Sequence, residues 1–208
     1  NVDGDVYNVA VGHAAGNNIT TGIQNTFIGG LAGDALTDAD GNVALGTYAL
    51  STDTLGSRAV AIGHGALLTQ NFTSATNNYN VGVGHSAGRA VTTGVNNTFI
   101  GGLAGDTTTT GAHNTAVGFD SLTSNTTASG NSAFGQSSLK SNTTGTSNTG
   151  LGGQALQTNS TGSSNTAVGV LALYANTTGR DNTALGFSAG ATNTTGFENT
   201  AIGMYALR

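Results

Sequence analysis

The sequence predicts an all-β protein that folds as a parallel β-solenoid, or β-roll, of twelve coils, each about 17 residues long. A five-residue motif returns at a nearly constant interval along the whole chain, and each copy of the motif ends in glycine. The chain of 208 residues contains 34 glycines and no proline, cysteine or tryptophan. Fixed repeats of this kind form solenoids, because each coil needs contacts only with its neighbours.

The repeated motif is Asn-Thr-Ala followed by Val, Ile or Leu and then Gly. Ten of the eleven intervals between copies of the motif are 17 residues long, and the remaining interval, from Ala59 to Asn80, is 21 residues long. We place the extra residues in a loop within residues 69–79. The first residue of the motif is numbered position 1. It is asparagine in every coil except the one that begins at Ala59: Asn8, Asn25, Asn42, Asn80, Asn97, Asn114, Asn131, Asn148, Asn165, Asn182 and Asn199.

The period predicts two short strands and two tight turns in each coil, since helical-hairpin repeats need roughly 33 residues or more. The first strand is expected at positions 1–5 and the second at positions 9–14. Glycine at position 5 would allow a turn or a close backbone approach that a Cβ atom would block. These glycines are Gly12, Gly29, Gly46, Gly63, Gly84, Gly101, Gly118, Gly135, Gly152, Gly169, Gly186 and Gly203.

Parallel stacking at about 4.8 Å per coil brings equal positions into columns. The position 1 asparagines are expected to form a ladder of hydrogen-bonded amides. Position 4 is always apolar, and we expect it to form the interior of the coil. Position 3, which is Ala, Gly or Phe, would then face outward. Its residues either permit tight coils or form a strip that packs against a second copy or a second sheet, and both interpretations stay open.

The repeats form one predicted domain over residues 1–208. Residues 7–34 and 79–106 match at 21 of 28 positions, which indicates duplication of a block of coils. Neither end carries the polar capping segment that solenoids use for solubility. We therefore expect the solenoid to continue beyond this chain or to stack end to end on another copy.

Composition argues against several classes of partner. Only 7% of residues are charged, the formal net charge is −5, and the five Lys and Arg residues form no basic patch for nucleic acid. No apolar run approaches the roughly 20 residues that span a bilayer. Without cysteine there is no disulfide framework.

The segments Asn165-Thr-Ala-Val-Gly169, Ala172-Leu173 and Asn176-Thr-Thr-Gly179 resemble two groups of proteins. One is the head domain of trimeric autotransporter adhesins, and the other is the β-solenoid repeat region of phage tail-fibre-like proteins. The resemblance covers essentially the whole chain and implies a left-handed β-roll that assembles as a homotrimer and serves attachment. The uniform coil of this chain is longer than the adhesin coil.

No catalytic residue and no cofactor is expected, because the acidic residues do not converge as paired carboxylates would. Asp34 and Asp106 share a column but are four coils apart. Asp181 and Glu198 are stacked in neighbouring coils, where a solvated turn is the favoured interpretation.

Two patterns in the sequence resemble parts of metal sites. Asp38 and Asp40 have the alternating oxygen ligands of a calcium loop, as does Asp3-Gly-Asp5, but the complete twelve-residue loop is absent. A column of histidines at position 6 could bind a metal on a trimer axis, although solvated turn residues are favoured. These histidines are His13, His64 and His85.

Eight asparagines begin Asn-x-Ser/Thr sequons, and five of them share position 12. Either a row of glycans or a ladder of asparagine side chains would explain the column, and the ladder is favoured. In the recurrent Asn-Thr-Thr-Gly block, strand alternation would leave Asn and one Thr outward, which argues against a flat ice-binding Thr array. The sequon asparagines are Asn18, Asn71, Asn96, Asn125, Asn142, Asn159, Asn176 and Asn193.

The expected function is that of a non-enzymatic structural segment of an extracellular fibre or filament, used for surface attachment or spacing. The expected partner is the chain itself, as a homotrimer or an end-to-end polymer, with a cell-surface or glycan receptor as a further candidate. The alternative is a solenoid that binds a glycan or ice.

Overall fold

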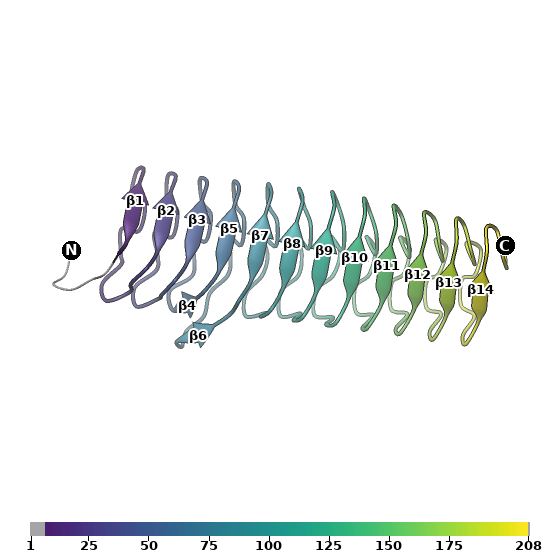
Figure 1. The fold of residues 1–208 in the computed structure, drawn as a ribbon. Helices are drawn as coiled ribbons and strands as arrows, with labels where there is room; N and C mark the ends of the chain where they lie inside the picture. Colours follow the sequence, from purple (N-terminus) through teal and green to yellow (C-terminus); the bar gives the residue numbers. More distant parts are fainter. Residues whose placement is uncertain (1–6, 208) are drawn as a thin grey trace.

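The structure, a computed structural model, describes residues 7–207 as a rod of stacked coils (Figure 1). These residues contain no helix, and so none that could cross a membrane. The main sheet has twelve parallel strands, each covering positions 2–4 of a coil. They are β1 (Val9–Val11), β2 (Thr26–Ile28), β3 (Val43–Leu45), β5 (Val60–Ile62), β7 (Val81–Val83), β8 (Thr98–Ile100), β9 (Thr115–Val117), β10 (Ser132–Phe134), β11 (Thr149–Leu151), β12 (Thr166–Val168), β13 (Thr183–Leu185) and β14 (Thr200–Ile202).

Every coil adds one strand to this sheet in strict register. In β2 and β3, for example, Phe27 lies beside Ala44 and Ile28 lies beside Leu45. The predicted all-β parallel β-solenoid, with a repeat of about 17 residues, is thus confirmed. The number of coils needs correction, because the twelve strands are joined by eleven intervals and the chain makes about eleven complete coils.

The predicted second strand at positions 9–14 is wrong. Within the described residues the chain forms turns there, and the second, two-stranded sheet of β4 (Gly56–Ser57) and β6 (Thr76–Asn77) occurs beside the insertion instead. The reason is local: the residues at positions 7 and 9 have a left-handed backbone, as at Asp120 (φ 61°) and Leu122 (φ 52°). A strand cannot accommodate such residues.

Backbone hydrogen bonds nevertheless join the coils in the turn region. The N–H of Leu122 donates to the carbonyl of Ser138 at 3.0 Å, and the N–H of Ser124 donates to the carbonyl of Lys140 at 3.0 Å. Both bonds run from one coil to the next. The coils are therefore held together by their backbones outside the sheet as well as within it.

The predicted interior column is also wrong. Position 3 faces inward and is buried, whereas position 4 faces outward. Successive strand residues do point to opposite faces, as predicted. The more hydrophobic of the two sets, at position 4, is the outward one. Leucines at position 9 and alanines at position 8 already occupy the narrow interior, so only a small residue fits opposite them in most coils.

The two phenylalanines at position 3 show how the interior is filled. Phe99 is fully buried, and a Cβ added to Gly88 would lie only 2.6 Å from its Cδ2 atom. A Cβ on Gly105 would collide with the same ring. In the duplicated block, Phe27 lies in the same way between Gly16 and Gly33. A large residue at position 3 therefore requires glycine at position 9 in its own coil and the preceding one.

The insertion lies within residues 69–79 and carries β6 out of the row of strands (Figure 1). A buried carboxylate anchors it: Asp53 accepts hydrogen bonds from Gly56 N at 3.0 Å, Phe72 N at 3.0 Å and Gln70 Nε2 at 2.6 Å. Three donors to one carboxylate offset the loss of its hydration.

Candidate functional site

One side of the rod is formed by the outward residues of the twelve strands, at positions 2 and 4. We call this surface the outer strip. Position 2 is Thr, Ser or Val, and most position 4 side chains are between 38% and 67% exposed. The position 4 residues are Val11, Ile28, Leu45, Ile62, Val83, Ile100, Val117, Phe134, Leu151, Val168, Leu185 and Ile202.

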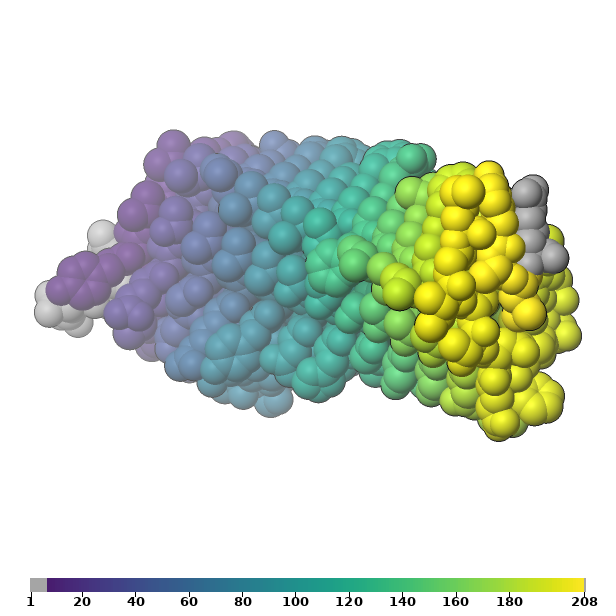
Figure 2. All heavy atoms as spheres, turned by 45° about the vertical axis from the view of Figure 1, so that its right-hand side comes forward, coloured from purple at the N-terminus to yellow at the C-terminus, as the bar shows by residue number. Residues whose placement is uncertain are grey.

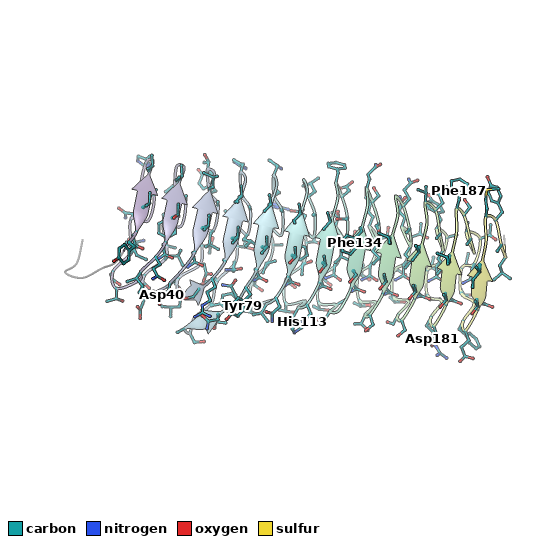
Figure 3. All side chains as sticks on the ribbon, viewed as in Figure 1. Asp40, Tyr79, His113, Phe134, Asp181 and Phe187 are labelled. Atoms are coloured by element: carbon teal, nitrogen blue, oxygen red, sulfur yellow. The ribbon has the colours of Figure 1, made fainter. Side chains whose placement is uncertain are left out.

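Charged groups are excluded from the outer strip. In none of the twelve strands does position 2 or position 4 hold Asp, Glu, Lys or Arg. In Figure 3, Asp40 and Asp181 lie at the lower turns, whereas Phe134 lies on the sheet. The space-filling view shows the atoms of successive coils in continuous rows along the rod (Figure 2). The outer strip is thus a long, uncharged and largely apolar surface.

The size of the outer strip can be estimated from strand geometry. Twelve strands at about 4.8 Å, with two outward residues and their side chains about 12 Å across, give on the order of 700 Å². Apolar patches of about 300–600 Å² are the largest on typical monomers and often functional, and a standard protein interface buries roughly 800 Å² per partner. The strip is large enough to form most of an interface.

Position 6 extends the outer strip unevenly. In the C-terminal half, four large apolar side chains between 42% and 70% exposed lie there: Phe119, Val170, Phe187 and Met204. In the first six coils the same position holds only His, Gly or Thr: His13, Gly30, Thr47, His64, His85 and Gly102. The apolar surface therefore widens toward the C-terminal end.

The position 1 asparagines form a buried ladder that closes each coil. The side chain of Asn148 donates to the carbonyl of Gly162 at 2.7 Å, across the coil, and accepts from the backbone N–H of Asn165 at 3.0 Å, in the next coil. The same pair of bonds recurs along the column, for example from Asn25 to Ala39 and Asn42. Their role is structural, because the amide groups are buried and hydrogen-bonded inside the rod.

The one missing member of this ladder is compensated. Where Ala59 lacks a side-chain oxygen, the backbone N–H of Asn80 donates instead to Asn78 Oδ1 at 2.9 Å, within the insertion. Asn80 Nδ2 also donates to Gln70 Oε1 at 2.9 Å. The extra residues and the substituted ladder position therefore belong to one local arrangement, a link that the spacing of the motif did not reveal.

The position 5 glycines form a column where the strand ends. Their φ angles lie between 117° and 141°, and a Cβ on Gly118 would lie 2.7 Å from the backbone of Gly135 in the next coil. Both the backbone angle and the close approach require glycine there.

The candidate calcium ligands Asp38 and Asp40 do not converge on a common site. Asp38 accepts a hydrogen bond from Thr21 Oγ1 at 2.6 Å, and Asp40 accepts one from Ile23 N at 2.9 Å. Asp3 and Asp5 lie outside the described residues. In residues 7–207, no group of three or more His, Cys, Asp or Glu could hold a metal ion. The two carboxylates instead tie neighbouring coils together.

The duplicated acidic residues have different surroundings. Asp106 forms a bidentate ion pair with Arg89, with N–O distances of 2.8 and 3.2 Å. Hydrogen bonding to Asp106 raises the pKa of Arg89. Asp34 has no such partner, and its Oδ1 atom is buried without a hydrogen bond. Burial raises the pKa of Asp34 above its usual value. Asp181 pairs with the exposed Arg180 at 2.6 Å.

The sequons at position 12 form a second interior ladder. Asn142, Asn159 and Asn176 are fully buried, and each donates to the preceding asparagine of the column at 2.8–3.3 Å. Glycans cannot occupy these amides in the folded rod. Asn18 and Asn96 are exposed, whereas Asn71 is half-buried.

The expected orientation of the Asn-Thr-Thr-Gly block is wrong. Asn176 points inward, while Thr177 and Thr178 both lie on the outside. The block is a turn, so strand alternation does not apply to it. Thr177 donates its hydroxyl to the carbonyl of Thr194 at 3.0 Å, and Thr178 is exposed.

Two of the position 6 histidines lie together. The rings of His64 and His85 are stacked, with centroids 5.4 Å apart and planes inclined by 8°. The ring of Tyr48 meets His64 edge-on at 5.9 Å. His13 is exposed at the same position, three coils away.

No protein-family model, curated protein or solved structure matches this chain. The resemblance to adhesin heads and phage tail fibres therefore rests on the repeated sequence motif alone.

Proposed function

We propose that this chain is a non-enzymatic structural segment of an extracellular fibre, used for surface attachment or spacing, in which copies associate side by side through the outer strip. The observation that carries the proposal is the exposure of an apolar residue at position 4 in successive coils, from Val11 to Ile202. Covering this surface removes apolar area from water, which drives association. A homotrimer is the form that the resemblance to adhesin heads suggests.

The distribution of apolar residues favours parallel copies. In a parallel arrangement the wide C-terminal half of the strip, with Phe119 and Phe187, meets its own counterpart. In an antiparallel arrangement the same residues would meet the half that carries His64, His85 and glycines. Matching apolar surfaces bury more area without leaving polar groups unpaired.

Single cysteines test this arrangement, because the chain has none of its own. Ile28→Cys and Leu185→Cys place a thiol on the outer strip near opposite ends. Parallel copies predict a disulfide between like chains for each variant alone. Disulfides only in a mixture of the two variants would indicate antiparallel copies, and no disulfide in any sample would contradict association through the strip.

Ice binding is the second candidate, supported by hydroxyls on the outer strip. From Thr98 to Thr200, position 2 is Thr or Ser in seven consecutive strands, beside the apolar position 4 column. A flat, regular and uncharged array of hydroxyl and apolar groups can order water. Thermal hysteresis that is lost in Thr149→Lys would favour this function, and its absence in the wild-type chain would exclude it.

A further inference from the structure

We propose that His64 and His85 form a binding site for a divalent transition-metal ion of the zinc class. The two side chains project from neighbouring coils at position 6, and their stacked rings have centroids 5.4 Å apart. Both residues are exposed, so their rings can turn toward a common ion. Metal–nitrogen bonds of about 2.0–2.1 Å require the two ligating nitrogens to approach within about 4 Å of each other.

The chemistry of the pair selects the class of ion. Neutral imidazole is the commonest protein ligand for zinc and related ions, whereas calcium and magnesium require oxygen ligands. Positions 1–8 of the four coils around the pair, from Asn42 to Ala104, contain no Asp, Glu, Lys or Arg. Arg89 and Asp106, at position 10 of two of these coils, pair with each other, and both histidines are exposed and so accessible to a metal.

Two histidines leave the coordination incomplete, and a second copy can complete it. Zinc prefers four ligands, and residues 7–207 offer no third His, Cys, Asp or Glu beside the pair. Position 6 borders the outer strip, so parallel copies would bring two such pairs toward each other. This step rests on the proposed function, and it makes zinc a bridge that strengthens association of copies.

The test is a titration of the full chain with Zn²⁺ alone, by isothermal calorimetry near pH 7.5. His64→Gln and His85→Gln should each weaken binding at least about tenfold, since loss of even an outer-sphere partner of a metal ligand costs about 10- to 100-fold. His13→Gln is the matched control and should bind as the wild type does. Glutamine occurs naturally at this position as Gln136, so the fold should be unchanged.

The outcomes separate the two proposals. Unaltered Zn²⁺ affinity in the His64→Gln/His85→Gln double variant, or an equal loss in His13→Gln, overturns the metal site. Zn²⁺-enhanced association that disappears in the double variant supports both the site and the bridge. Binding at the pair by a chain that stays monomeric supports the site but contradicts the proposed association. Association without Zn²⁺ binding leaves the proposed function standing and overturns the metal site.

Discussion

The packing of Phe99 gives the sharpest prediction about stability. Phe99→Ala removes a fully buried ring that lies between Gly88 and Gly105, and neither glycine has a side chain to fill the space left behind. Buried Phe→Ala substitutions destabilise by about 3–5 kcal/mol, and the upper part of that range is expected where the site cannot collapse. The free energy of unfolding, from urea denaturation followed by circular dichroism, measures the loss. Phe197→Ala, at a ring that is 58% exposed, should cost about 1 kcal/mol or less.

A compensating variant tests the reason for the loss. In other coils, leucine at position 9 packs near a small residue at position 3, as Leu67 does against Gly82. Gly88→Leu and Gly105→Leu added to Phe99→Ala should therefore restore more than half of the lost stability. Gly88→Leu alone should destabilise the wild-type chain, since the new side chain collides with the ring. A triple variant no more stable than Phe99→Ala would refute this packing account.

Two further predictions concern buried polar groups. Asn148→Ala leaves the Asn165 N–H without a partner, while the Gly162 carbonyl keeps its bond from Asn159 Nδ2. The variant should lower the unfolding free energy by about 1–3 kcal/mol, whereas Thr149→Ala on the outward face should change it by less than about 0.5 kcal/mol; equal effects would contradict the ladder. At pH 7, Asp34→Asn should stabilise the chain by on the order of 1 kcal/mol, while Asp106→Asn should destabilise it by up to about 1 kcal/mol by breaking the partly exposed pair with Arg89. Burial raises the folded-state pKa of Asp34, so its ionised carboxylate destabilises the folded chain increasingly as pH rises above the unfolded-state pKa of about 3.9. The gain in unfolding free energy from Asp34→Asn should therefore shrink as pH is lowered toward that value. A gain that does not change with pH would contradict this explanation.

The repeat and the parallel stacking could be predicted from the sequence because they depend on spacing alone. Gly118 and Asn148 belong to two sets of residues that return at the same interval, and only in-register coils bring the members of each set together. The direction of the side chains could not be predicted in the same way. Both Ala133 and Phe134 are apolar, and which of them is buried depends on the narrow interior, where leucines such as Leu139 already occupy the space.

The turns limited prediction of the candidate site. Left-handed residues such as Leu122 and Leu139 carry no turn signature, so the sequence predicts a strand at positions 9–14. The stacking of His64 on His85 follows from their shared position in neighbouring coils, which the spacing of the motif makes visible. The inward direction of position 3 reveals the outer strip as the apolar surface.

Association through the outer strip is tested most directly by sedimentation equilibrium of three chains. The wild-type chain should sediment as an oligomer, and as a trimer if the resemblance to adhesin heads extends to assembly. Leu151→Asp places a charge on the strip, where burying it without a partner costs several kcal/mol, and should sediment as a folded monomer. Thr178→Asp adds the same charge at position 14, which Asp38 occupies naturally, and should remain oligomeric. A monomeric wild-type chain, or a Leu151→Asp variant as oligomeric as Thr178→Asp, would contradict the account.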